Sequence, residues 1–354
     1  MTRHDLALKK LHEGTVIPAN PLALNEKREF DEKRQRAIVR YYLDSGVGGL
    51  AVAVHTTQFE IRDKKHNLLE RVLRVAKDEA EKYEKKTGKV IVMVAGVCGK
   101  TEQATEEAKL ARAIGYDAVL LSPGGLNALS EDEMIVRTEA VAKIMPTIGF
   151  YLQTAVGGRA FSYNYWERLC AIPGVVAIKA APFNRYYTLD VVRAAATSPR
   201  ADEIALYTGN DDNIVIDLVS NYEFDIDGVH YEKRFVGGLL GHWSVWTKTA
   251  VELFERLRAY HGAKALPAEI LKLANEVTDT NAVFFDTANN FAGCIAGLHE
   301  VLRRQGLFEG TWCLNPEECM SPGQKEEIDR IYRMYPHLSD DDFVRENLER
   351  WLAD

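Results

Sequence analysis

The chain has 354 residues, a formal net charge of −8 and 46% hydrophobic residues. The length suits a barrel of about 250 residues with an appendage, and the apolar fraction allows a sizeable buried core. The negative charge argues against non-specific nucleic-acid binding, which requires a basic face.

Short apolar runs alternate with amphipathic stretches over the first two-thirds of the chain. We expect strands at 14–18, 48–54, 90–95, 117–121, 147–151, 175–179, 203–207 and 235–240. Helices are expected between them, at 30–45, 65–86 and 101–114 among others, with a capping box at Ser130 and Glu133. Strands that are apolar throughout are buried on both faces, which is typical of parallel sheets.

About eight strand–helix units predict a (β/α)₈ barrel, an α/β fold. A doubly wound sheet is the alternative, but no GxGxxG motif follows the first strand. Beyond Gly262 the pattern contains helices only, at 266–304, 324–335 and 340–352. We therefore predict a catalytic barrel over 1–262 and a C-terminal helical region over 263–354.

The five cysteines are irregularly spaced and include no CxxC pair, so neither a zinc ribbon nor a disulfide framework is indicated. Reduced thiols in a cytoplasmic protein are the simplest interpretation. The N-terminal segment 1–10 is polar and lacks the apolar region of a secretory signal. No apolar run approaches the roughly 18 residues that a membrane span needs.

Polar residues at the carboxyl ends of the strands are the candidates for chemistry, because active sites of such barrels lie there. Lys179 ends an apolar strand, a setting that favours the neutral amine and Schiff-base formation with a carbonyl. The alternative is a lysine that extends into solvent. Tyr151 could transfer protons or pack at the rim, and Thr56 and Thr57 could hold a carboxylate or form an ordinary turn.

Two further pairs of residues each leave two interpretations open. His55 and His242 could be acid–base groups in one pocket or packed, hydrogen-bonded histidines. Asp211 and Asp212 could bind a metal, but adjacent acids more often cap a helix; we expect no metal.

Taken together, four segments resemble one known family in order and spacing. His55-Thr56-Thr57-Gln58 is similar to the family's Gly-Thr-Thr-Gly-Glu segment, Gly149-Phe150-Tyr151 to its fifth-strand tyrosine, the strand ending at Lys179 to its lysine strand, and Thr208-Gly209-Asn210-Asp211 to its Ser-Gly-Asp-Asp turn. The family is that of dihydrodipicolinate synthase and N-acetylneuraminate lyase. The resemblance covers roughly residues 10–335.

The resemblance implies a barrel with C-terminal helices, a homo-oligomer (tetramer or dimer) and no cofactor. It implies that Lys179 forms a Schiff base with pyruvate or another 2-oxo acid, that Tyr151 is the proton shuttle and that Thr56 and Thr57 hold the substrate carboxylate. The expected catalytic residues are Lys179, Tyr151 and Thr56. The expected substrate-binding residues are His55, Thr57, Arg159, Gly209, Asn210 and His242.

The sequence also departs from the family pattern. Gly125 stands where the synthase has a relay tyrosine, and Val156 where it has the arginine that binds the second substrate's carboxylate; Arg159 is nearby. A missing charge-assisted hydrogen bond costs about 1.5–3 kcal/mol. We therefore expect poor dihydrodipicolinate synthase activity, and the bulky Trp243 and Trp246 suggest a bulkier or less charged second substrate.

The leading hypothesis is a lyase, an aldolase or dehydratase, that acts on a 2-oxo acid. A catalytically impaired 2-oxo acid-binding protein or sensor is the first alternative. A barrel enzyme that binds phosphate at Gly237-Gly238 and the following helix is the second, but it would leave Lys179 unexplained.

Overall fold

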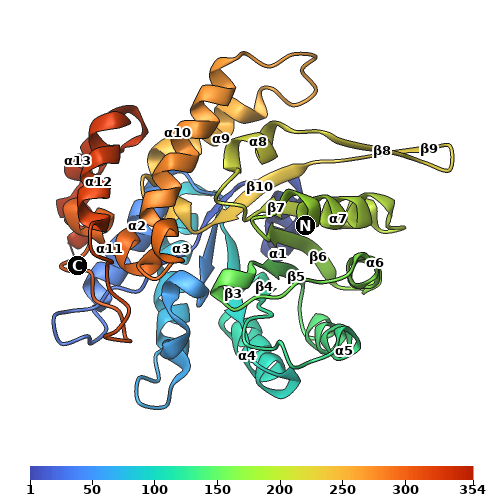
Figure 1. Ribbon diagram of the computed structural model, residues 1–354. Helices are drawn as coiled ribbons and strands as arrows, with labels where there is room; N and C mark the ends of the chain where they lie inside the picture. Colours follow the sequence, from blue (N-terminus) through green and yellow to red (C-terminus); the bar gives the residue numbers. More distant parts are fainter. Residues whose placement is uncertain (354) are drawn as a thin grey trace.

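The structure, a computed structural model that describes residues 1–353, is built around a parallel sheet of eight strands in the order β1-β10-β7-β6-β5-β4-β3-β2 (Figure 1). The barrel strands are β1 (Val16–Pro18), β2 (Gly49–Val52), β3 (Val92–Val97), β4 (Ala118–Leu121), β5 (Thr147–Leu152), β6 (Val175–Ala181), β7 (Ala205–Thr208) and β10 (Phe235–Leu240). A parallel bridge between Ala19 and Ala51 joins β1 to β2. The predicted (β/α)₈ barrel is confirmed, because a doubly wound sheet would not bring its edge strands together.

A helix on the outside of the barrel follows each strand (Figure 1). These helices are α2 (Glu32–Ser45), α3 (Leu69–Thr87), α4 (Thr101–Ile114), α5 (Glu131–Ala142), α6 (Tyr163–Ala171), α7 (Arg185–Thr197), α8 (Ile214–Val219) and α9 (Thr247–Arg258). The predicted capping box is present at the start of α5: Ser130 accepts a hydrogen bond from the Glu133 amide, and the Glu133 carboxylate accepts one from the Ser130 amide.

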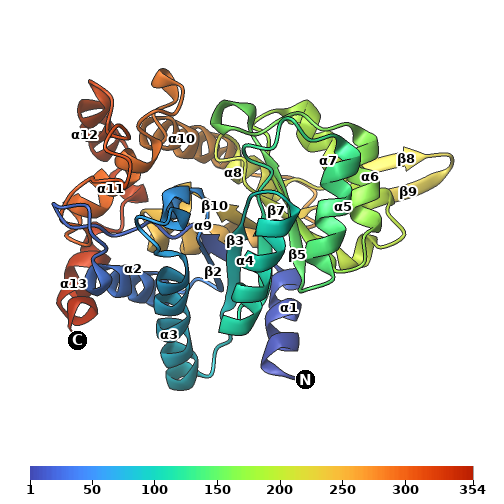
Figure 2. The same ribbon diagram turned by 90° about the horizontal axis from the view of Figure 1, so that it is seen from below.

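Helix α1 (Arg3–Glu13), which the sequence analysis did not predict, closes the amino-terminal end of the barrel (Figure 2). Its apolar residues Ala7 and Leu11 pack with the residues that point into the barrel. Arg3 donates hydrogen bonds to Asp117 and Glu84. Because this end is closed, the cavity described below opens only toward the carboxyl ends of the strands.

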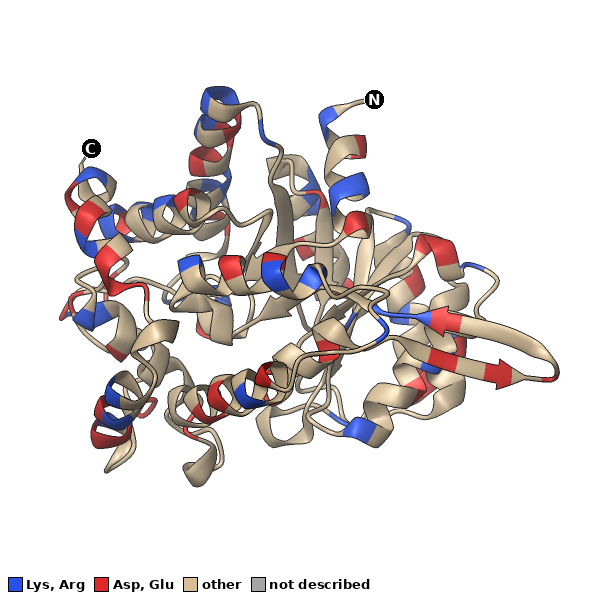
Figure 3. Cartoon of the chain, turned by 90° about the horizontal axis from the view of Figure 1, so that it is seen from above, with Lys and Arg blue, Asp and Glu red and all other residues tan. Residues whose placement is uncertain are grey.

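A second addition is the two-stranded hairpin of β8 (Tyr222–Ile226) and β9 (Val229–Lys233), which lies between α8 and β10 in the chain. It projects from the side of the barrel and carries several acidic residues (Figure 3). Elsewhere, basic and acidic residues are interspersed along the outer helices.

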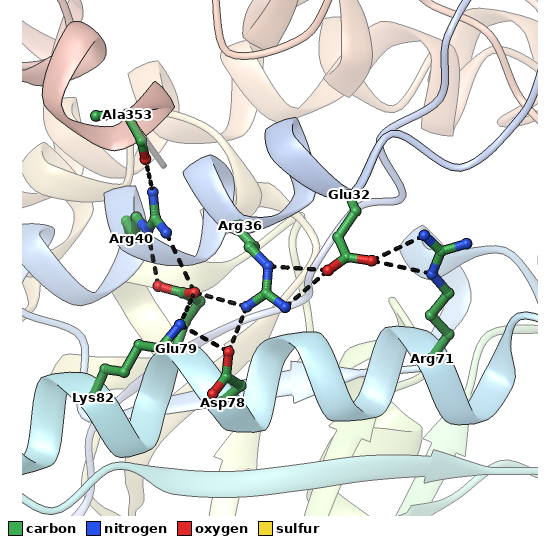
Figure 4. A network of polar contacts seen from close by, with 8 residues as sticks. All are labelled: Glu32, Arg36, Arg40, Arg71, Asp78, Glu79, Lys82 and Ala353. Atoms are coloured by element: carbon green, nitrogen blue, oxygen red, sulfur yellow. Dashed lines mark hydrogen bonds and ion pairs between the residues drawn. The ribbon is translucent and has the colours of Figure 1, made fainter.

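The C-terminal region contains α10 (Glu269–Phe284), α11 (Cys294–Arg304), α12 (Gln324–Met334) and α13 (Asp341–Leu352). The predicted helical region 263–354 lies within the described residues except for its last position. Helix α13 packs against α2. Arg40 on α2 donates to the carbonyls of Trp351 and Ala353 while it also pairs with Glu79 on α3 (Figure 4). Arg40 thus joins the C-terminal region to two helices on the side of the barrel through hydrogen bonds and an ion pair.

Among residues 1–353, no helix combines the length and the apolar character that crossing a membrane would require.

Candidate active site

A cavity of about 70 Å³ lies at the carboxyl ends of the barrel strands. Four of the predicted site residues line it: His55, Thr56, Lys179 and Gly209. The other five, Tyr151, Thr57, Asn210, Arg159 and His242, do not line it. The cavity is therefore built partly from the predicted residues and partly from residues that the sequence analysis did not assign to a site.

Lys179 is in β6 and points into the cavity. Its side chain is 8% exposed, and its Nζ lies 4.5 Å from the centroid of the Phe150 ring. Burial lowers the pKa of the Lys179 amine below its usual value, and the charge of Asp211 opposes that shift. The amine is thus more readily neutral than a solvated lysine, which is the form that attacks a carbonyl.

Gly209 follows β7 and leaves the space that the lysine occupies. A Cβ atom at this position would lie 2.4 Å from Lys179 Cε and 2.8 Å from the Cβ of Ala181. Both distances are far below van der Waals contact. The absence of a side chain at Gly209 is therefore required for the observed position of Lys179.

We expect Gly209→Ala to fold but to react slowly, because Lys179 must move by about 1 Å, and a displacement of that size can cost about 10²-fold in rate. The measurement is the rate of covalent trapping of pyruvate, with thermal unfolding as the control for stability. Gly124→Ala is the matched variant, since its nearest neighbour would lie 3.3 Å away. Equal trapping rates in the two variants would contradict the prediction.

Asp211 is the acid that the sequence analysis did not place in the site. It is buried and lines the cavity, and its Oδ1 accepts a hydrogen bond from the backbone N–H of His242 at 2.8 Å. Burial raises the pKa of the Asp211 carboxyl, whereas the Lys179 charge and the His242 amide act in the opposite direction. A carboxyl group with a raised pKa can both accept and donate a proton near neutral pH. Its position beside Asp212 suggested only a helix cap or a metal ligand.

The two threonines after β2 have different environments. Thr56 lines the cavity, and its buried hydroxyl has no hydrogen-bond partner within the described residues. The Thr57 hydroxyl donates to the carbonyl of Asn20 at 2.6 Å and accepts from the Val54 amide. Thr56 can therefore donate to a ligand, while Thr57 holds the loop in place.

His242 is buried and His55 is half-buried, and the loss of solvation lowers the pKa of each to about 4. His55 lines the cavity as a neutral imidazole. The ring of His242 instead lies 5.6 Å from the ring of Phe284 and close to Asn281. His242 thus supports the site through its backbone amide on Asp211, and the two imidazoles do not face one pocket.

Tyr151 is not placed beside Lys179, and the reason is a bulge in β6. Thr147 pairs with Val175, but Ile148 pairs with Ala177, so Val176 has no partner on β5. The extra residue brings Phe150 opposite Lys179 and Tyr151 opposite Ala180. Successive side chains of a strand point to opposite faces. Phe150 therefore faces the cavity and Tyr151 faces the outer helices.

The surroundings of Tyr151 agree with that orientation. Its ring stacks on Trp166 at 4.9 Å, and its hydroxyl accepts a hydrogen bond from the backbone N–H of Phe161 at 3.3 Å. The structure therefore does not support the predicted role of Tyr151 as the proton shuttle.

Asn210 and Arg159 also have structural contacts outside the cavity. The Asn210 side chain accepts from the Phe183 amide and donates to Asp217. Arg159 donates to the carbonyl of Leu129 and lies over the ring of Phe161. The cavity residue in that loop is Val156, so Arg159 does not replace the missing arginine.

Two other expectations are corrected by the packing. Gly237 and Gly238 lie inside β10, where Cβ atoms would lie 2.3 Å from the Thr15 carbonyl oxygen and 2.6 Å from the Trp243 ring. They leave no space for a phosphate. Trp243 and Trp246 are core residues, packed against Phe254 and Phe284 respectively, and do not line the cavity.

The C-terminal region supplies the part of the wall that no motif indicated, namely Phe285, Phe291 and Cys294. As for metals, residues 1–353 contain no cluster of three or more His, Cys, Asp or Glu residues able to hold an ion.

Comparison with known proteins gives one family match: residues 13–221 fit the family model described as the dihydrodipicolinate synthetase family. A probable 5-dehydro-4-deoxyglucarate dehydratase 2 from Streptomyces coelicolor is 27% identical over 49% of this chain, and the match spans about half of that protein's length, 51%. An N-acetylneuraminate lyase from Citrobacter koseri is 23% identical over 61% of this chain and 68% of its own.

Solved structures show the same fold. A dihydrodipicolinate synthase from Oceanobacillus iheyensis superposes with a TM-score of 0.74 at 17% identity, over 95% of this chain and 100% of its own. An N-acetylneuraminate lyase from Fusobacterium nucleatum gives a TM-score of 0.70 at 19% identity, over 92% and 99% of the two chains. A structure of the lyase from that organism complexed with pyruvate gives 0.68 at 18% identity, over 92% and 97%.

Proposed function

Since the chain belongs to the dihydrodipicolinate synthetase family, we propose that it is a Schiff-base-forming lyase, an aldolase or dehydratase, that acts on pyruvate or another 2-oxo acid through Lys179. The observation that carries the proposal is a buried lysine near the carboxyl end of a barrel strand, in a cavity that a carboxyl group of raised pKa also lines. The similarity of this chain to an N-acetylneuraminate lyase and to a probable 5-dehydro-4-deoxyglucarate dehydratase supports the proposal.

In this proposal the neutral Lys179 Nζ attacks the substrate's keto carbon. The proton that the nitrogen gives up passes to the alkoxide, which becomes the carbinolamine hydroxyl. The protonated Asp211 carboxyl then donates a second proton to this hydroxyl, which leaves as water, so that the cationic iminium forms beside an Asp211 carboxylate. The unpartnered Thr56 hydroxyl donates to the substrate carboxylate, a charge-assisted hydrogen bond. The resulting iminium withdraws electrons from the adjacent carbon, so that a C–H, C–C or C–O bond next to it can be broken or formed.

Incubation with pyruvate and borohydride tests the proposal. Reduction of the iminium is expected to add to the protein the mass of pyruvate, less one water and plus two hydrogens. A panel of aldehydes and of deoxy-keto-sugar acids then separates aldolase from dehydratase activity. An unchanged protein mass would contradict the proposal.

We expect the rate of trapping, measured with cyanoborohydride, to rise with pH and to be half-maximal well below about 10.4, the ordinary pKa of a lysine amine. The reason is that burial lowers the pKa of Lys179, and only the deprotonated amine reacts. A midpoint at the ordinary value would show that the amine is fully hydrated in the free protein.

The alternative of a 2-oxo acid-binding protein or sensor is favoured by one observation: the Tyr151 hydroxyl points away from the cavity, and Gly125 lacks the side chain of a relay tyrosine. Turnover with the same panel distinguishes it, because a sensor would be trapped by borohydride without converting any substrate. We also propose, from the sequence resemblance, a cytoplasmic homo-oligomer in which residues 1–262 form the catalytic barrel.

A further inference from the structure

The cavity wall beyond Lys179, Thr56 and Gln153 is mostly apolar. Its charged members among residues 1–353 are Lys179 and Asp211 alone, and His55 is neutral because burial lowers its pKa. The one side-chain amide of the wall is Gln153. The large apolar side chains of the wall are Leu120, Phe150, Leu152, Val156, Phe183, Phe285 and Phe291. The groups that can bind a 2-oxo acid thus lie together, and the rest of the space has few donors or acceptors.

Two phenylalanines from distant parts of the chain meet at this wall. Phe183 follows β6 and Phe291 precedes α11, and their rings make an edge-to-face contact with centroids 6.0 Å apart. Both have positive φ, 51° for Phe183 and 67° for Phe291. Such conformations are unfavourable for bulky residues and persist where surrounding contacts hold them, often at ligand sites.

Specific hydrogen bonds hold both phenylalanines. The Phe183 amide donates to the buried Asn210 side chain at 3.1 Å, and the Phe291 amide donates to the Asp286 carbonyl at 3.0 Å. The Asp286 carboxylate in turn accepts from the Gly293 amide and from the Ser321 hydroxyl. The aromatic wall is thus an ordered part of the site.

We infer that the partner of the 2-oxo acid is an uncharged aldehyde with an apolar side chain, aromatic or branched aliphatic, bound between Phe183, Phe291 and Val156. The inference rests on the proposed function. A carboxylate or a polyhydroxylated chain placed between these three side chains would lose water and gain no hydrogen bond from them, whereas an apolar group gains by leaving water and by contact with the rings.

The reaction is an aldol addition that conserves all atoms. The iminium on Lys179 loses a proton from the pyruvate methyl group to Asp211, and the resulting enamine carbon forms a bond to the aldehyde carbon. The aldehyde oxygen takes the proton from Asp211 and becomes a hydroxyl. Water then hydrolyses the iminium and releases a 4-hydroxy-2-oxo acid and the free lysine; the reverse sequence cleaves that product.

The test is a set of kcat/KM values for pyruvate with four aldehydes: benzaldehyde, isobutyraldehyde, succinic semialdehyde and aspartate semialdehyde. We expect the first two to exceed the two charged aldehydes by about tenfold or more. Equal or higher values for a charged aldehyde, or no turnover of any apolar aldehyde, would overturn the inference.

Phe291→Ala locates the site. It is expected to raise the KM for benzaldehyde about tenfold or more, and by a larger factor than it changes the rate at which borohydride traps pyruvate. Phe30→Ala is the matched control, because Phe30 is also partly buried but lies against Arg71 outside the cavity. An unchanged KM in Phe291→Ala would overturn the placement. Trapping of pyruvate without a preference for apolar aldehydes refutes this inference alone, whereas failure of trapping refutes the proposed function as well.

Discussion

Lys179→Ala is expected to abolish the covalent trapping of pyruvate and all turnover, while the protein stays folded. Schiff-base formation needs a primary amine within the cavity, and Lys179 is the lysine that lines it in the described structure. Alanine fits the buried position without a clash, because β6 already has alanines at the next two positions. The measurements are the protein mass after borohydride reduction and the rate of product formation.

Lys77→Ala provides the matched control. Lys77 has the same 8% exposure as Lys179, but it lies on α3 and pairs with Glu81 at 3.3 Å. We expect Lys77→Ala to retain trapping in full. Labelling that persists in Lys179→Ala would assign the chemistry to a different amine and refute the proposed function.

Asp211→Asn is expected to lower kcat by about 10²–10⁴-fold, the typical effect of removing a positioned proton-transfer group. The asparagine oxygen can still accept from the His242 amide, so the fold and the turn are retained. Loss of the negative charge also removes the interaction that raises the pKa of Lys179. The pH midpoint of pyruvate trapping is therefore expected to move to lower pH, a shift that mere structural damage would not produce.

Two variants serve as controls for the effect of Asp211→Asn. Asp212→Asn removes the neighbouring carboxyl, which does not line the cavity, and is expected to stay within about threefold of the parent. Tyr151→Phe is expected to do the same, because the Tyr151 hydroxyl lies against the Phe161 amide. If Tyr151→Phe lowered kcat more than Asp211→Asn did, the result would contradict the role of Asp211 and support Tyr151 as the proton carrier.

The barrel could be predicted because its strands are local patterns of apolar residues. The eighth strand, 235–240, and the helix 101–114 have the bounds that the sequence suggested, and Lys179 could be identified as the residue that follows such a run. Helix α1 and the hairpin of β8 and β9 were missed. The α1 sequence is polar and short of apolar positions, and the hairpin strands are only partly buried, so neither has the continuous apolar run of the other strands.

The site was harder to predict because it depends on register and on distant contacts. An unpaired Val176 decides whether Phe150 or Tyr151 faces Lys179, and a bulge leaves no mark in the order of residue types. Counting forward along both strands from the pair Thr147 and Val175, without the bulge, would place Tyr151 opposite Lys179, which is the wrong residue. The aromatic wall could not be found either, because Phe183 and Phe291 meet only when the C-terminal helices dock.

The position of Phe285, Phe291 and Cys294 in the chain has a consequence for biosynthesis. The ribosome makes these residues after every strand of the barrel, and domains begin to fold during translation. A barrel that assembles before they emerge lacks this part of the wall, so Lys179 is more exposed to water and its pKa is lowered less. We therefore expect the chain to reach its full reactivity toward 2-oxo acids only after its last helices have emerged and docked.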